Sequence, residues 1–180
     1  TLQLGAGGVP DALARFLTDK RRLGLHSEMI SNGAIDLIQS GVIDNSMKTV
    51  SPGRSVISFM LGDRRLYDFV DGNDVIEMHP IDFTNDPAII RQNPNVVAIN
   101  SAVQIDLTGQ ANAESLGTRQ LSGVGGQVDF ARGAALSPGG KFILAFPSTA
   151  KDGAISRVVP ILDPGAAVTT PRNDVDYVVT

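Results

Sequence analysis

The stretch SVISFML, residues 55–61, decides the fold class of this chain. It is almost continuously apolar and has the length of a strand that is buried on both faces, as the strands of parallel sheets are. Residues 64–70, which follow closely, have the pattern of a helix. A buried strand followed by a helix is the repeating unit of parallel α/β folds, so this stretch predicts a parallel sheet.

Strand and helix patterns alternate on both sides of this stretch. Runs rich in Val, Ile and Leu predict strands at residues 2–4, 96–107, 141–146, 155–161 and 175–179. Helices are predicted at residues 34–40, at residues 88–92, and from Pro10 onward with Leu13, Phe16 and Leu17 on the apolar face. We therefore predict one α/β domain, with a mostly parallel sheet covered by helices.

The composition excludes several classes of protein. The 180 residues are 42% hydrophobic, which is enough to bury one ordinary core. A net charge of −4 that is not gathered in blocks argues against a nucleic-acid surface, so any phosphate site must be local. Cysteine is absent, which excludes disulfides and thiol catalysis. No apolar run approaches the ~20 residues that a membrane-spanning helix needs, and we expect a cytoplasmic protein.

Glu28, in the segment GLHSEM (residues 24–29), is the first candidate for chemistry. The chain has only three Glu beside sixteen Asp, and this one stands between an apolar run (Leu23, Leu25) and a polar turn at residues 31–33. A carboxylate so placed can sit at a strand end that faces a cleft and act as a nucleophile. The ordinary alternative for a Glu after a strand is a solvated or salt-bridged surface role.

Two glycine-rich loops are the second candidate feature. They are GAGGVPD (residues 5–11) and SGVGGQVDF (residues 122–130). Glycines let backbone N–H groups approach a ligand closely and adopt positive φ, so such loops can bind an oxyanion or a phosphate. Each loop can equally be an ordinary turn. Together with one isolated carboxylate, the two loops suggest acyl chemistry.

Four further polar residues have local alternatives to a functional role. Asn85 is a natural N-cap for the helix predicted at residues 88–92, and Lys151 can be a plain surface charge. His26 and His79 are the only histidines, and without Cys they give a metal site little support. A His26–Glu28 dyad requires the strand to continue to Glu28, so packing or positioning is the expected role of both histidines.

Five segments carry a family resemblance when they are read together: LGLHSEMISNG (23–33), DFTNDPAIIRQN (82–93), AINSAVQIDLTGQ (98–110), SGVGGQVDFARGA (122–134) and PSTAKDGAISRVVP (147–160). In order from Leu4 to Val179, the chain resembles the acetyl-CoA hydrolase/transferase family, in particular the carboxyl-terminal half of its 4-hydroxybutyrate and butyrate CoA-transferase branch. This resemblance implies the family I CoA-transferase fold, which is NagB/RpiA/CoA transferase-like. It also implies that residues 1–180 are a carboxyl-terminal catalytic domain, with an amino-terminal half in the same polypeptide.

The resemblance also implies roles for individual residues. Glu28 would be the covalent nucleophile, and the backbone amides of Ala6 and Gly126 would form the oxyanion hole. Coenzyme A enters as a substrate, in the form of acyl-CoA, and no metal or redox cofactor is expected. The expected coenzyme-binding residues are Gly125, Gly126, Asn85 and Lys151.

The activity that the resemblance implies is transfer of CoA between an acyl-CoA and a short-chain carboxylate of the acetate, butyrate or 4-hydroxybutyrate type. The mechanism would be ping-pong, through a glutamyl-CoA thioester. Two alternatives stay open: hydrolysis of acyl-CoA in the same site, and a non-catalytic ligand-binding or assembly module of the same fold. The expected partners are these substrates, the amino-terminal half and further copies in a homo-oligomer, without nucleic acid or membrane.

Overall fold

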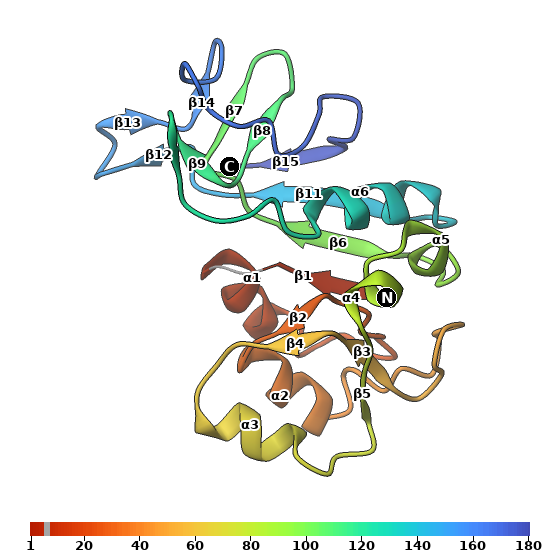
Figure 1. Ribbon diagram of the computed structural model, residues 1–180. Helices are drawn as coiled ribbons and strands as arrows, with labels where there is room; N and C mark the ends of the chain where they lie inside the picture. Colours follow the sequence, from red (N-terminus) through yellow and green to blue (C-terminus); the bar gives the residue numbers. More distant parts are fainter. Residues whose placement is uncertain (6–7) are drawn as a thin grey trace.

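The centre of the molecule is a parallel sheet, seen in a computed structural model that describes residues 1–5 and 8–180 (Figure 1). Four of its strands are hydrogen-bonded in the order β1-β6-β11-β15, and every pairing between them is parallel. These strands are β1 (Leu2–Leu4), β6 (Val97–Asn100), β11 (Lys141–Ala145) and β15 (Tyr177–Val179).

Beyond β1 the sheet continues through single bridges and short strands. Leu2 bridges Leu25, and His26 bridges Val56, both in parallel. The additional strands are β2 (Met29–Ile30), β3 (Ser55–Ile57), β4 (Phe59–Met60) and β5 (Ile76–Met78). β3 pairs with β5 and β2 pairs with β4, again in parallel. The prediction of a mostly parallel sheet is therefore confirmed.

Helices cover both faces of this sheet. Successive side chains of a strand point to opposite faces, so neighbouring residues of β6 contact different buried clusters. Val97 packs against the cluster that contains residues of α2 and α3, and Ala98 belongs to the cluster that contains residues of α5 and α6. The helices are α1 (Gly8–Leu13), continued by the 3₁₀ turn η1 (Ala14–Phe16), α2 (Gly33–Gln39), α3 (Arg64–Val70), α4 (Ile81–Thr84), α5 (Pro87–Ile90) and α6 (Gln127–Leu136). No helix in residues 1–5 and 8–180 has both the length and the apolar character needed to cross a bilayer.

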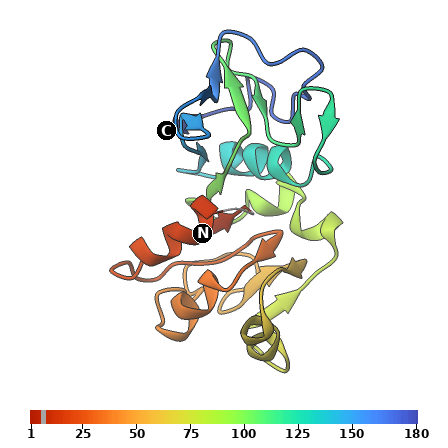
Figure 2. The same cartoon turned by 90° about the vertical axis from the view of Figure 1, so that its left-hand side faces the viewer.

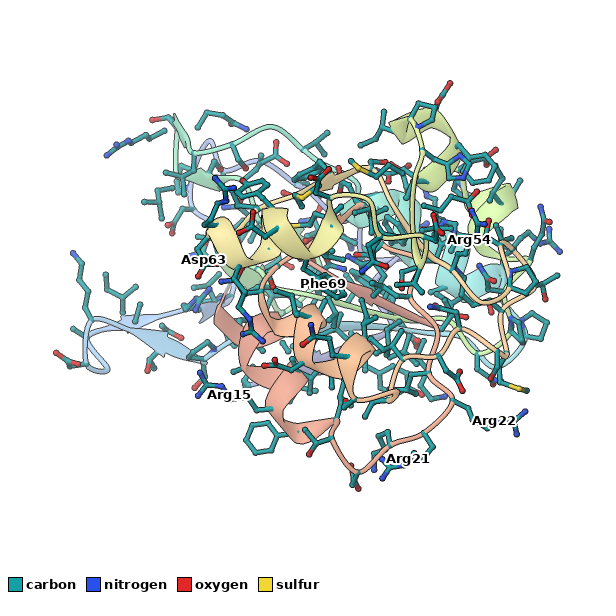
Figure 3. The ribbon with its side chains drawn as sticks, turned by 90° about the horizontal axis from the view of Figure 1, so that it is seen from below. Arg15, Arg21, Arg22, Arg54, Asp63 and Phe69 are labelled. Atoms are coloured by element: carbon teal, nitrogen blue, oxygen red, sulfur yellow. The ribbon has the colours of Figure 1, made fainter. Side chains whose placement is uncertain are left out.

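The helices α2 and α3 agree with their predicted positions. The N–H of Arg65 donates to the carboxylate of Asp63 at 3.0 Å, which caps α3 at its start. Figure 3, seen from below, labels Asp63 and Phe69 near the two ends of this helix, beside α2. α2 ends just before Gly41, whose φ of +73° is a conformation that favours glycine.

Short strands gather at the end of the molecule opposite α2 and α3 (Figures 1 and 2). They form the small sheet β14-β7-β8 and the antiparallel hairpins β9-β10 and β12-β13. These strands are β7 (Gln104–Asp106), β8 (Ala111–Asn112), β9 (Ser115–Leu116), β10 (Arg119–Gln120), β12 (Thr149–Ala150), β13 (Ile155–Ser156) and β14 (Val158–Val159). Each of them has only two or three residues, too few for the alternation that predicts a strand.

Three strand predictions were wrong in the same way, because a predicted single strand is broken. Residues 55–61 divide at Ser58, and only β3 is buried, whereas Leu61 is 62% exposed. Residues 96–107 divide at 101–103 into β6 and β7, which belong to different sheets. Residues 155–161 divide at Arg157 into β13 and β14.

Three details of the helices also differ from expectation. Phe16 is 76% exposed and is not on a buried face, where Ala14 lies instead. The N-cap of α5 is Asp86 and not Asn85, since the Asp86 carboxylate accepts from the N–H of Ala88 at 2.7 Å. Helix α6, which buries Phe130, follows the second glycine loop and was not predicted at all.

Candidate functional site

Glu28 lies where the pairing of two parallel segments is interrupted. His26 bridges Val56 before the interruption, and β2 pairs with β4 after it. Between them the carbonyl oxygen of Glu28 accepts two hydrogen bonds, from the N–H of Ser58 at 2.9 Å and from the N–H of Phe59 at 3.1 Å. Two residues thus oppose one, which is the arrangement of a β-bulge, and bulges re-aim side chains.

The Glu28 carboxylate reaches the second glycine loop. The N–H of Gly126 donates to Glu28 Oε2 at 3.2 Å, although the two residues are 98 positions apart. A Cβ added to Gly126 would lie 2.7 Å from that oxygen and 2.3 Å from Nδ2 of Asn85. Because Gly126 has φ −90°, glycine is needed here for close approach and not for backbone conformation. Gly125 has φ +60° and open space around it, so it makes the turn.

Two cavities meet at Glu28, and Val124 and Gly125 also line both of them. The first has a volume of about 570 Å³. Its polar side chains include Gln3, Asn100, Gln127 and Arg157. The second has a volume of about 550 Å³ and is acidic. Its carboxylates besides Glu28 are Asp82, Asp86 and Asp129.

The carboxyl group of Asp129, in the second cavity, has a raised pKa. Burial raises the pKa of its carboxyl group, Arg132 opposes that shift, and the carboxylate of Asp86 adds to it. A second anion would therefore be disfavoured on this side of Glu28.

Asn85 lines the second cavity at Glu28, and it lies at the end of α4 and not at the start of α5. Its predicted contact with the coenzyme stays a prediction. In the described part of the chain, the buried side-chain polar atoms without a hydrogen-bond partner are Ser58 Oγ, Thr84 Oγ1 and Asn85 Oδ1. Ser58 opposes Glu28 in the bulge, and Thr84 precedes Asn85. Because buried polar groups are nearly always paired, unpaired atoms in these segments fit a place where a ligand supplies the partner.

The first glycine loop approaches Glu28 through Ser27. The Ser27 hydroxyl donates to the carbonyl oxygen of Leu4 at 3.2 Å and lies 3.3 Å from the N–H of Leu4. Gly5 comes next and lines the first cavity, where a Cβ on it would be 2.3 Å from Oδ1 of Asn100. Ala6 lies outside the described residues, so the oxyanion-hole role of its amide stays a prediction.

Lys151 lies apart from Glu28. It is exposed in the turn of the β12-β13 hairpin, with φ +49°. It lines neither of the two cavities at Glu28. Its predicted contact with the coenzyme stays a prediction, and it requires a ligand that extends out of the cavity.

His26 is a buried support of the site. Its Nε2 donates to the carbonyl oxygen of Thr84 at 2.9 Å, and its Nδ1 is 3.5 Å from the side-chain nitrogen of Asn93. These contacts tie the segment that carries Glu28 to the end of α4, where Asn85 lies. The expected packing or positioning role of His26 is therefore confirmed.

His79 has a separate role, because its Nε2 lies 2.6 Å from a carboxylate oxygen of Glu77 and its ring stacks on Phe83. The described part of the chain contains no group of three or more His, Asp or Glu side chains arranged to hold a metal ion.

The burial of His26 predicts a pH dependence of stability. Burial lowers the pKa of its imidazole from 6.5 to about 4, and the hydrogen bond to Thr84 opposes this only in part. The unfolded chain therefore binds a proton below pH 6.5 that the folded chain does not. This contribution to stability is fully present above pH 6.5 and is lost as the pH falls towards about 4, by ~3 kcal/mol over that range.

Urea unfolding at a series of pH values from 7 to 4 measures this effect. The carboxylates also titrate in this range, so the informative quantity is the difference between wild type and His26→Gln, which should lose less stability on acidification. Equal acid sensitivity of wild type and His26→Gln would contradict the prediction.

Sequence reasoning missed the polar wall of the first cavity. The side-chain amide of Asn100 donates to Oε1 of Gln3 at 2.8 Å, and both side chains are buried. The available signal was a polar residue inside a strand that is otherwise apolar, as in Leu2-Gln3-Leu4. Arg157 was missed as well, although it is a charge within the predicted strand at residues 155–161.

The site thus holds a carboxylate against the backbone N–H of a glycine loop, in the wall of a cavity of a parallel α/β domain. The chain belongs to the acetyl-CoA hydrolase/transferase family, since residues 62–180 match the model of the acetyl-CoA hydrolase/transferase C-terminal domain. Glu28 precedes this match but lies within the alignments to full-length relatives.

Two of the most similar relatives are named as CoA transferases. The 4-hydroxybutyrate coenzyme A transferase of Clostridium kluyveri is 57% identical over 180 residues, which are 100% of this chain and 42% of that protein. The succinyl-CoA:cyclohexane-1-carboxylate CoA transferase of Geobacter metallireducens is 52% identical over 179 residues, 99% of this chain and 41% of that protein. The crystal structure of RipA from Yersinia pestis matches with a TM-score of 0.93 and 46% identity, covering 98% of this chain and 40% of that one.

This chain therefore spans less than half the length of the relatives that it matches. The predicted fold of the CoA-transferases is confirmed, and the chain is homologous to enzymes.

Proposed function

We propose that these 180 residues form the carboxyl-terminal catalytic domain of a CoA-transferase that moves CoA between an acyl-CoA and a short-chain carboxylate. The observation that carries the proposal is the Glu28 carboxylate, held at the wall of two cavities by the N–H of Gly126. The amino-terminal half of the same polypeptide would complete the acyl pocket, and the full-length protein would be a homo-oligomer. Relatives named for 4-hydroxybutyrate and for cyclohexane-1-carboxylate support a carboxylate acceptor but leave its size open.

The first half of the reaction loads the enzyme with CoA. The Glu28 carboxylate attacks the acyl carbonyl, and the C–S bond breaks to give an acyl-glutamyl anhydride and CoA thiolate. The thiolate then attacks the glutamyl carbonyl, and the anhydride C–O bond breaks to release the first carboxylate and leave a glutamyl-CoA thioester. A carboxylate is a poor nucleophile in water, but one that is positioned and half-buried can attack a thioester.

The second half reverses these steps with a new carboxylate. This carboxylate attacks the glutamyl carbonyl and displaces CoA thiolate, which attacks the acyl carbonyl of the new anhydride. The products are a new acyl-CoA and free Glu28, so no proton or electron is consumed. The cosubstrate is acyl-CoA itself, and each step uses groups of the protein and the substrates alone.

The Gly126 N–H suits the charge that develops in these steps. Whenever the glutamyl carbonyl is attacked, negative charge gathers on a carboxylate oxygen of Glu28, and this N–H already lies 3.2 Å from Oε2. Such pre-aimed donors are the usual source of oxyanion stabilisation. The amide of Ala6 would supply the second donor.

Coenzyme binding would use the neighbours of Gly126. The unpaired Oδ1 of Asn85 is a free acceptor for an amide N–H of the coenzyme, and the turn at Gly125 keeps the loop open beside it. Lys151, exposed at the hairpin turn, would meet an anionic part of the coenzyme outside the cavity.

Two other functions use the same features. An acyl-CoA hydrolase would let water take the place of the second carboxylate in the same site. A ligand-binding or assembly module would keep the fold without turnover. The contact between Glu28 and Gly126 favours an enzyme, because a carboxylate against a backbone N–H in a cavity wall serves no evident packing purpose.

A covalent adduct separates the three functions. The full-length protein, given acyl-CoA without an acceptor carboxylate, should carry CoA on the peptide that contains Glu28, as measured by mass spectrometry after digestion. Borohydride should reduce this adduct, because a thioester is reducible and a carboxylate is not. Steady turnover with little adduct would indicate a hydrolase, and neither adduct nor turnover would overturn the enzymatic proposal.

A further inference from the structure

Arg157 brings a positive charge into the wall of the first cavity. It stands between β13 and β14, and its Nε donates to the carbonyl oxygen of Val103 at 2.9 Å, while Nη2 donates to the carbonyl oxygen of Ala102. Its guanidinium also lies over the ring of Phe146, 5.2 Å from the centroid. These contacts fix the side chain against residues that line or adjoin the cavity at Glu28.

Among the side chains that the structure describes, which exclude Asp11, no Asp or Glu forms an ion pair with Arg157. The bonds to Ala102 and Val103 engage two of its five N–H donors. Arginines normally pair their fork-shaped head with a carboxylate or a phosphate. Arg157 is also half-buried, so a solvation shell compensates for the missing partner only in part.

The two cavities at Glu28 differ in their charged side chains. Arg157 lines the first cavity, whereas Asp82, Asp86 and Asp129 line the second. Figure 3, seen from below, labels four other arginines that line neither cavity and so do not alter this contrast: Arg15, Arg21, Arg22 and Arg54. An anion that approaches Glu28 therefore meets a cation only on the first side, whereas carboxylates repel it on the second.

We propose that Arg157 binds the carboxylate of the acceptor substrate in the first cavity and so directs it to the glutamyl carbonyl of Glu28. This inference rests on the proposed CoA-transferase function and assigns the acceptor subsite within it. A carboxylate fits the free N–H donors of a guanidinium, which can hold both of its oxygens.

The same arrangement favours binding of the acceptor carboxylate after the glutamyl-CoA thioester has formed. In the free enzyme the first cavity contains the Glu28 carboxylate and the Arg157 cation, so its net charge is zero. Formation of the glutamyl-CoA thioester removes the charge of Glu28 and leaves the guanidinium without a counter-ion in the cavity. The loaded enzyme then attracts the carboxylate that must attack it, with the C–O bond forming at the glutamyl carbon and the C–S bond breaking to release thiolate.

The test isolates the second half of the reaction. Full-length wild type and Arg157→Gln are loaded with CoA from acyl-CoA, separated from free substrate, and mixed with increasing concentrations of acetate or butyrate. Loss of the charged contact should raise the carboxylate concentration needed for half-maximal discharge by about 10- to 100-fold. Discharge of the same thioester by hydroxylamine, which is uncharged at neutral pH, should be unchanged.

Two further variants separate charge from fold. Arg157→Lys keeps the charge but cannot hold two carbonyl oxygens and a carboxylate together, so it should restore part of the affinity for the acceptor. Arg91→Gln removes an exposed arginine that lines neither cavity and should behave as wild type. Thermal unfolding of each variant verifies that it is folded.

The outcomes distinguish this inference from the proposed function. Absence of a CoA adduct in wild type would overturn both. An adduct that discharges with the same carboxylate dependence in wild type and Arg157→Gln would overturn only the role of Arg157. Equal slowing of carboxylate and hydroxylamine discharge, or an Arg157→Lys variant no better than Arg157→Gln, would assign Arg157 to holding residues 101–103 in place and would also overturn the inference.

Discussion

Replacing Glu28 by Gln in the full-length protein is expected to lower CoA transfer by roughly 10⁴-fold or more, the scale seen when a covalent nucleophile is removed. Gln has the same volume, and the side chain is half-buried in a cavity wall, so the fold should not change. The main-chain carbonyl that holds Ser58 and Phe59 in the bulge is also retained. Steady-state transfer assays and thermal unfolding measure the two effects.

The control for this substitution is Asp71→Asn, the same chemical change on an exposed residue outside both cavities. It should leave transfer at the wild-type level. A Glu28→Gln enzyme within tenfold of wild type would show that another group attacks the thioester.

Adjacent glycines should respond in opposite ways to the same change. In Gly126→Ala the added Cβ would lie 2.7 Å from Glu28 Oε2 and 2.3 Å from Asn85 Nδ2. Both atoms are ends of side chains that can move away, so the cost falls on the arrangement of the site more than on stability. Transfer should drop by about 10²- to 10³-fold, as when one oxyanion donor is lost.

Gly125→Ala should lower stability more than Gly126→Ala does and should lower transfer less. Its φ of +60° is unfavourable for alanine and should cost about 1–2 kcal/mol of stability, but the new methyl group meets no atom within 4 Å. Urea unfolding and transfer rates, measured on both variants, give the comparison. If Gly125→Ala lost more activity than Gly126→Ala, the close contact between Gly126 and Glu28 would not be the feature that matters.

The parallel sheet, α2, α3 and a cleft beside Glu28 could all be anticipated, because each depends on a pattern within one segment. Apolar runs predict burial wherever they occur, and Asp63 caps α3 through a bond to Arg65 in the same segment. Helix α6 escaped prediction because the glycines before it dominate the local pattern. Its buried Phe130 and Ala134, four residues apart, were the signal to use.

The broken strands were errors of one kind, and all of them lie at the site. An apolar run records that a segment is buried, but it does not record where its pairing stops. Pairing stops at Ser58 because the Glu28 carbonyl takes two N–H groups. The chain turns at residues 101–103, where two carbonyl oxygens accept from Arg157. Departures from regular structure are commonly concentrated where function is, and here they aim side chains into the cavity.

The sequence by itself determined the class of fold, and the resemblance of its segments indicated the family, since burial patterns and family segments are properties of single stretches of chain. Only the tertiary structure decided which polar groups meet. Gly126 contacts Glu28 across 98 residues, and Asn85 joins them because His26 bonds the carbonyl of Thr84. Arg157, which lies between β13 and β14, comes from a segment still further along the chain. Such long-range contacts depend on how helices and hairpins pack on the sheet, and no local sequence pattern predicts that packing.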